Sequence, residues 1–205
     1  MIRTHSVRVG LNFLVAFCLI ATFDRSTLPA TPGVTSDTVI FGQSATFSGQ
    51  NGKLGKHYKA GIEAAFGVRN DRGGVNGRSL KLISFDDAYE PSRAAANAEM
   101  FVSEDNVLAV IGGVGTPTAK RIVPVLKTAK IPFVGPFTGA DFLRNANLYP
   151  NVINLRASYL DETRKLVDHI IRDRGKSRMG IFYQEDGFGR AVLRDFKVVL
   201  DSYNI

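Results

Sequence analysis

The 205-residue sequence contains a single cysteine and three histidines. With Cys18 alone, no disulfide can form within the chain. His5 lies near the N-terminus, while His57 and His169 fall on two different predicted helices, so they form neither a metal-binding constellation nor a Ser-His-Asp arrangement. The sequence therefore predicts no metal, no cofactor and no enzymatic activity.

Basic runs with interleaved aromatic residues are also absent, although the formal net charge is +7. Lys and Arg are scattered along the chain, and the largest local cluster is RDRGKSR at 172–178. Nucleic-acid binding would concentrate such charges on one element. We therefore interpret the positive charge as a solvated surface and expect no nucleic-acid partner.

A membrane-spanning apolar run is missing as well. The apolar segment VGLNFLVAFCLIATF at 9–23 is shorter than the about 20 residues that cross a bilayer. Arginines precede it and a turn-rich polar stretch follows, which is typical of an export signal. We expect residues 1–36 to be a signal peptide and the protein to be periplasmic or extracytoplasmic. Cys18 is expected to leave with the signal, because Phe17 stands where a lipoprotein signal places a small residue.

From Asp37 onward, apolar strand patterns alternate with amphipathic helix patterns. This order predicts an α/β fold, a doubly wound parallel sheet with helices on both faces. We expect a first lobe at 37–150 and an incomplete second α/β lobe at 151–205, which is too small to close a core by itself. The predicted strands are 38–45, 79–85, 107–113, 131–136, 151–157 and 178–186, and the predicted helices are 55–71, 91–105, 116–129, 158–175 and 188–202.

Ligands of open parallel sheets bind beyond the carboxyl ends of the strands, so the loop GGVGTPT at 112–118 is a candidate. It lacks the lysine of a Walker loop, and Thr118 stands where a dinucleotide motif has its third glycine. Thr116 can instead cap a helix that has Pro117 in its first turn, whose free amides favour a small anion such as a carboxylate. A pure capping role remains open, but GPFTGAD at the adjacent strand end supports a binding site.

Asp86 and Asp87 follow the second predicted strand. They could act as an acid–base pair or bind a cation. Adjacent residues at a strand end point in opposite directions, however, and no third ligand is near in sequence. We expect them to accept hydrogen bonds within their loop.

The ordered set of motifs resembles the substrate-binding proteins of ABC importers, specifically the branched-chain amino acid receptor family with the type I periplasmic-binding fold. The resemblance covers residues 37–203. It rests on VIFGQSATFSG, GKHYKAGIEAAF, RGGVNGRSLKLISFDDAYEP, VLAVIGGVGTPTAKRIVPVL, IPFVGPFTGADFLR, NLRASYLDETRKLVDHI and IFYQEDGFGRAVL.

The resemblance implies a monomeric two-lobe clamshell that holds an amino acid or similar small polar solute and delivers it to permease subunits in the membrane. It also implies roles for particular residues. Gly115 and Thr116, with Phe137, Thr138 and Gly139, would hold the charged groups of the ligand. Gln50 and Leu54 would line its side-chain pocket, and Phe188 would cover it from the second lobe.

The sequence departs from the family in two ways. Threonine at 116, leucine at 54 and phenylalanine at 188 differ from leucine-binding relatives, which leaves the identity of the ligand open. The family continues well past residue 205, which suggests a truncated member that has half of the site. A sensory ligand-binding module of a receptor and a fragment that binds nothing remain alternatives, whereas an exported Rossmann-like enzyme is disfavoured.

Overall fold

The computed structural model describes residues 31–204. Most of the expected signal peptide, with Cys18 and His5, lies outside the described residues. Residues 31–36 are part of the fold, because the Ile40 amide donates to Gly33 O at 2.7 Å and Arg78 Nε donates to Thr35 O at 2.7 Å. Among the described residues, the fold therefore includes 31–36, which precede the expected first lobe at 37–150.

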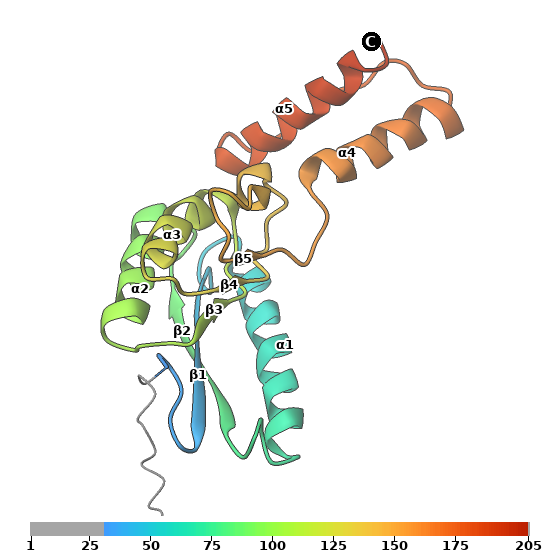
Figure 1. Ribbon diagram of the computed structural model, residues 1–205. Coiled ribbons are helices and arrows are strands. Elements are labelled where there is room, and N and C mark those ends of the chain that lie inside the picture. The colour runs from blue at the N-terminus through green and yellow to red at the C-terminus, as the bar shows by residue number, and fades with distance from the viewer. Residues whose placement is uncertain (1–30, 205) are drawn as a thin grey trace, which may run out of the picture. The chain divides into compact units, whose positions relative to one another are not determined.

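Within residues 31–204, five parallel strands form one sheet in the order β2-β1-β3-β4-β5 (Figure 1). The strands are β1 (Thr38–Ala45), β2 (Ser79–Asp86), β3 (Ala109–Ile111), β4 (Phe133–Val134) and β5 (Val152–Ile153). Strands that are consecutive in the sequence run parallel, so each returns through a crossover. The predicted α/β fold with a doubly wound parallel sheet is confirmed.

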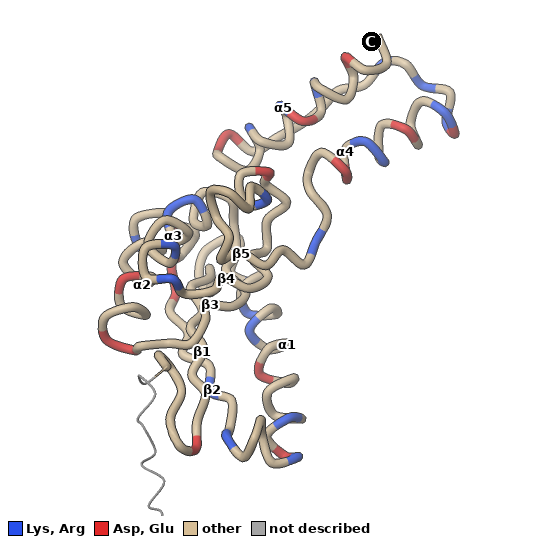
Figure 2. Tube along the Cα trace, in the orientation of Figure 1, with Lys and Arg blue, Asp and Glu red and all other residues tan. Residues whose placement is uncertain are grey.

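The helices follow the strands in alternation. They are α1 (Gly52–Asn70), α2 (Pro91–Ser103), α3 (Thr116–Thr128), the short 3-10 helix η1 (Asp141–Arg144), α4 (Tyr159–Asp168), its π-helical extension η2 (His169–Asp173) and α5 (Gly187–Asp201). None of these helices is both long and apolar enough to cross a membrane. Lys and Arg are spread over several elements and alternate with acidic residues (Figure 2).

Alternation along β1 places neighbouring side chains on opposite faces of the sheet. Ile40 packs against the main core, in which Phe101 of α2 and Ile122 of α3 are fully buried. Phe41 lies on the other face, where its ring centroid is 5.2 Å from that of Phe66 on α1. Helices therefore cover both faces of the sheet. Because its strands are parallel, their carboxyl ends lie at one edge.

Strand β5 pairs with β4, so residues 152–153 extend the first sheet. The expected second lobe begins at residue 151, and its first predicted strand, 151–157, therefore contributes residues 152–153 to the first sheet.

Helix α4 begins as the sequence predicts. Ser158 is its N-cap, and the Ser158 Oγ accepts a hydrogen bond from the Asp161 amide at 3.0 Å. Its apolar stripe is only partly buried, since Val167 is buried whereas Leu166 remains exposed. Helix α4 packs against α5 through a small cluster that contains Val167, Phe196 and Val199.

The predicted strand at 178–186 is wrong. These residues form no paired strand, although Ile181, Phe182 and Tyr183 are β-prone. Phe182 is 104% exposed. A strand forms only where a neighbour accepts and donates its backbone hydrogen bonds, and within residues 31–204 no strand pairs with this segment.

Candidate functional site

A cavity of about 340 Å³ lies at the carboxyl edge of the sheet. Its walls come from the loops after β2, β3, β4 and β5, from the N-terminal parts of α1 and α3, from α4, and from the start of α5. The volume is in the range of small-ligand sites. Its lining residues are Asn51, Leu54, Tyr89, Val114, Gly115, Thr116, Phe137, Arg156, Tyr159, Glu162, Thr163, Leu166, Gln184, Phe188 and Val192.

The loops after β3 and β4 are joined by backbone hydrogen bonds. The Phe137 amide donates to Gly113 O at 2.7 Å, and the Gly115 amide donates to Phe137 O at 3.4 Å. Gly115 has a φ of 107°, and a Cβ there would lie 2.5 Å from the Tyr89 ring. Glycine is therefore required at the start of α3 by both backbone conformation and space.

Three buried hydroxyls meet at one side of the cavity. Thr116 Oγ1 lies 2.7 Å from Thr138 Oγ1 and 3.2 Å from the Tyr159 hydroxyl, and Thr138 Oγ1 lies 3.1 Å from the Tyr159 hydroxyl. We call this group the hydroxyl triangle. Each hydroxyl can donate to the next around the ring. Thr138 Oγ1 also accepts from the Ala140 amide at 3.2 Å, so the lone pairs left to accept from a ligand are those of Thr116 and Tyr159.

The predicted capping role of Thr116 is wrong. The N-cap of α3 is Gly115, and no side chain makes a capping hydrogen bond there. The Thr116 hydroxyl reaches the neighbouring loop instead, because Thr138 and Tyr159 lie within hydrogen-bond distance. Thr118 uses its own hydroxyl locally and donates to Val114 O at 2.6 Å.

The structure brings five of the eight predicted site residues into the cavity wall: Leu54, Gly115, Thr116, Phe137 and Phe188. Thr138 lies behind Thr116 as a member of the hydroxyl triangle. Gly139 also lies behind the wall, where a Cβ would come 2.6 Å from the Tyr159 ring. Gln50 does not line the cavity, because it falls in an exposed turn before α1 and its neighbour Asn51 takes that place.

Sequence reasoning missed an ion pair in the cavity wall. Arg156 forms a salt bridge with Glu162 of α4. The guanidinium also lies 5.3 Å from the Phe137 ring centroid and 5.5 Å from that of Tyr159. Arg156 stands in a quoted motif, NLRAS, but nothing local to it indicates that two aromatic rings and a carboxylate surround it.

Tyr159 and Tyr89 were also missed. The Tyr159 ring packs edge-on against Phe188 with the centroids 5.4 Å apart, which links α4 to α5. The Tyr89 hydroxyl donates to Asp186 Oδ2 at 3.2 Å. Burial and the nearby Asp186 carboxylate raise the pKa of Tyr89, so the phenol stays protonated and remains a donor. Only the spatial pairing of distant segments reveals these contacts.

A second cavity of about 500 Å³ adjoins the first and shares Leu54, Phe137 and Arg156 with it. His57 lines this second cavity. The Tyr58 hydroxyl, also in its wall, donates to Gly135 O at 2.6 Å. The other described histidine, His169, is exposed and lies 2.8 Å from the Asp173 carboxylate.

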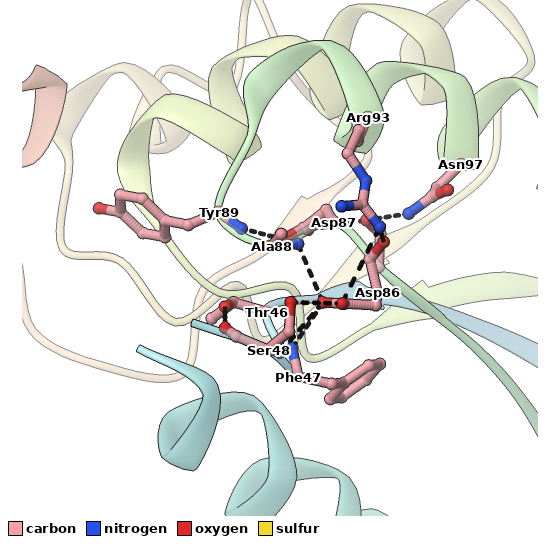
Figure 3. Close-up of polar contacts among 10 residues, drawn as sticks. Thr46, Phe47, Ser48, Asp86, Asp87, Ala88, Tyr89, Arg93 and Asn97 are labelled. Carbon is pink, nitrogen blue, oxygen red and sulfur yellow. Dashed lines mark hydrogen bonds and ion pairs between the residues drawn. The ribbon is translucent and has the colours of Figure 1, made fainter. Parts of the chain in front are cut away.

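Asp86 and Asp87 accept hydrogen bonds in their loop, as the sequence predicts (Figure 3). Asp86 Oδ1 accepts from the amides of Phe47 and Ala88 at 2.8 and 2.9 Å. Asp87 is fully buried and accepts from the Ser44 hydroxyl at 2.8 Å. No group of three metal-ligating side chains occurs within the described range 31–204.

The family model described as periplasmic binding protein matches residues 38–205. Leu/Ile/Val-binding protein homolog 2 of Brucella abortus is 35% identical over 96 residues, which are 45% of this chain and 26% of that relative.

Solved structures are also similar to this chain. A possible leucine/isoleucine/valine-binding protein from Rhodopirellula baltica is similar with a TM-score of 0.77 and 35% identity, over 86% of this chain and 46% of that one. A substrate-binding periplasmic protein from Ralstonia solanacearum has a TM-score of 0.77 and 29% identity, over 82% of this chain and 47% of that one. The chain spans less than half the length of each of these relatives.

Proposed function

The chain belongs to the periplasmic binding protein family, and we propose that it binds an amino acid of the branched-chain type, or a similar small polar solute, in the cavity at the carboxyl edge of its sheet. The observation that carries this proposal is the hydroxyl triangle, because three buried hydroxyls meet at one side of a cavity whose wall also carries apolar side chains. A small number of placed polar groups in an apolar pocket is the usual composition of a ligand site.

The cavity offers a separate environment for each part of an amino acid. The first-turn amides of α3 have no intrahelical acceptor, and the positive end of the helix dipole favours the ligand carboxylate. The hydroxyl triangle has lone pairs that can accept from the ammonium group. The apolar residues Leu54, Leu166, Phe188 and Val192 would surround an aliphatic side chain.

The Arg156–Glu162 ion pair supports a zwitterionic ligand. Both side chains lie in the cavity wall and pair with each other. A ligand with one charge would compete for one partner and leave the other uncompensated, which is unfavourable in a partly desolvated site. A zwitterion can replace both partners at once.

The proposed role is that of the extracytoplasmic solute-binding component of an ABC importer. Two relatives support it: a Leu/Ile/Val-binding protein homolog and a substrate-binding periplasmic protein. In this role the partners are the ligand and permease subunits in the membrane, and the protein acts by binding rather than by catalysis. The periplasm is the corresponding location.

Thr116→Val tests the proposal, because valine keeps the shape of the side chain and removes its hydroxyl. Titration calorimetry with L-leucine on the purified chain should give a dissociation constant about tenfold higher than for the wild type, since a hydrogen bond to a charged group is worth about 1.5–3 kcal/mol. Thr128→Val is the matched control: it changes a threonine at the other end of α3, whose exposed hydroxyl donates to Pro124 O. Equal affinity of the two variants would refute the assignment of Thr116.

A further inference from the structure

Two consecutive residues after β2 have left-handed backbone conformations. Ala88 has a φ of 50° and Tyr89 a φ of 66°. Neither is glycine, and this region is sterically unfavourable for residues with a Cβ. Such strain persists only where surrounding contacts impose it, and it is concentrated at functional positions.

The contacts that impose it come from the two aspartates. The Ala88 amide donates to Asp86 Oδ1 at 2.9 Å, and the Tyr89 amide donates to Asp87 Oδ1 at 2.9 Å (Figure 3). Each carboxylate thus holds the amide two residues further on, which is the geometry of an Asx turn. Asp87 is itself fixed, because its other oxygen accepts from the buried Ser44 hydroxyl.

The strained backbone directs the Tyr89 side chain into the cavity wall. Its ring lies against Gly115, where no side chain would fit. Its hydroxyl reaches Asp186 Oδ2 at 3.2 Å, while Asp186 Oδ1 caps α5 by accepting from the amides of Phe188 and Gly189 at 2.9 Å each. Tyr89 therefore joins the loop after β2 to the start of the helix that carries Phe188.

We propose that Tyr89 and Asp186 form a latch across the binding cavity and that Asp86 and Asp87 are positioning residues for Tyr89. The aspartates hold the backbone of Ala88 and Tyr89 in the left-handed region, and this conformation sets the phenol against the α5 cap. The latch is a property of the chain itself. Its effect on ligand affinity rests in addition on the proposed function.

Tyr89→Phe tests the latch without any ligand. Amide hydrogen exchange of Phe188 and Gly189 in the purified chain should accelerate about tenfold, as expected for loss of a hydrogen bond to a charged group. Tyr58→Phe is the matched control, because it removes a tyrosine hydroxyl bonded to Gly135 O and leaves α5 untouched. Unchanged exchange in Tyr89→Phe, or an equal change in Tyr58→Phe, would overturn the latch.

The positioning role is tested with two variants of Asp87. Asp87→Asn keeps an oxygen for the Tyr89 amide and should retain most of the protection at Phe188 and Gly189. Asp87→Ala should lose the protection of the Phe188 and Gly189 amides, as Tyr89→Phe does. In the double variant Asp87→Ala with Tyr89→Phe, these amides should exchange no faster than in Tyr89→Phe alone. Additive effects would mean that Asp87 acts independently of Tyr89 and would overturn its positioning role.

Ser44→Ala serves as a milder variant should Asp87→Ala fail to fold. It removes the hydroxyl that fixes Asp87 and should produce part of the same acceleration at Phe188 and Gly189. Wild-type exchange in Ser44→Ala, with Asp87→Ala unfolded, would count against the positioning role.

Calorimetry with L-leucine separates this proposal from the proposed function. If the latch closes the cavity over the ligand, Tyr89→Phe should weaken L-leucine binding several-fold, and Asp87→Ala should weaken it to the same extent. Absence of L-leucine binding by the wild type would refute the amino acid assignment and leave the exchange result to decide the latch. Binding with equal affinity in wild type and Tyr89→Phe would refute a role for the latch in affinity.

Discussion

The sheet side of the chain, residues 38–153, and the helical side, residues 159–201, differ in the size of their apolar cores and in the hydrogen bonding of one carboxylate on each side, Asp86 and Asp195. On the sheet side, Asp86 accepts four hydrogen bonds and Phe101 is fully enclosed between β strands and α3. On the helical side, Asp195 is buried, yet its Oδ2 has no hydrogen-bond partner among residues 31–204, and Phe182 is fully exposed. Replacing a phenylalanine or an aspartate is therefore expected to change the free energy of unfolding differently on the two sides, because the surroundings of these residues differ.

The two sides should differ most in the free energy of unfolding that is lost when a core phenylalanine is replaced by alanine. Phe101→Ala should lower the free energy of unfolding by about 3–5 kcal/mol, because the ring is fully buried and stacks on Phe85 with the centroids 5.2 Å apart. Phe196→Ala on α5 is the matched substitution, since Phe196 packs in the small cluster between α4 and α5. There we expect a loss of about 1–2 kcal/mol, because this cluster can open locally.

Urea denaturation measures both free energies of unfolding, and hydrogen exchange locates the loosened residues. Phe196→Ala should accelerate exchange in α4 and α5 and leave β1 and β3 unchanged. Equal losses in both variants, with exchange accelerated throughout, would show that the two sides unfold as one unit.

The next expected effect concerns the two contrasting carboxylates. Burial raises the pKa of Asp86, but hydrogen bonds from the Ser48 side chain and from the Phe47, Ala88 and Ser48 amides outweigh it and lower the pKa from 3.8 to about 2. Its ionised form therefore stabilises the fold above pH 4, and this stabilisation is lost as the pH falls towards 2. For Asp195, burial and nearby Asp141 raise the pKa, so its ionisation disfavours the fold as the pH rises above 3.8.

Substitution by asparagine should therefore act in opposite directions at pH 7. Asp86→Asn should lower the free energy of unfolding by about 1 kcal/mol, with the deficit vanishing at acid pH. Asp195→Asn should raise it, and this gain should also vanish below pH 4, where both forms are neutral. Thermal unfolding followed by circular dichroism between pH 2 and pH 7 measures both trends. If both variants changed the free energy of unfolding in the same direction at pH 7, the contrast between Asp86 and Asp195 would be contradicted.

The smallest expected effect is at the segment that fails to become a strand. Phe182→Ser should change the free energy of unfolding by less than about 0.5 kcal/mol, because the side chain has no packing to lose. Phe133→Ser on β4 is the control, where the buried ring should make the same change strongly destabilising. A large loss in Phe182→Ser, measured by urea denaturation, would show that residues 178–184 are packed in solution.

Much of the fold was predictable because its signals are local. The boundaries of β1 follow from the alternation of its residues, and the start of α2 follows from the proline in its first turn. Both signals act within a few residues. The N-cap of α4 at Ser158 is likewise encoded by a capping box. The segment at 178–186 has an equally strong local signal and still forms no strand, since pairing depends on a partner elsewhere in the chain.

The candidate site was predicted in part. Leu54, Gly115, Thr116, Phe137 and Phe188 line one cavity, whereas Gln50 lies outside it. The ligand-binding roles that the family resemblance implies for them stay predictions. Arg156, Glu162 and the Tyr89–Asp186 contact could not be found from the sequence. Each joins segments whose proximity depends on how the strands and helices pack.

The sequence by itself determined the parallel α/β sheet, the glycine-rich start of α3 and the loop role of the two aspartates, because periodicity, turn residues and caps act over a few positions. Tertiary structure alone decided that the Thr116 hydroxyl joins Thr138 and Tyr159 rather than capping its helix. It also decided that Tyr89 meets Asp186 and that the apolar segment around Phe182 stays unpaired. The physical reason is that hydrogen bonds across loops and between strands require two partners, and chain packing determines whether the second one is within reach.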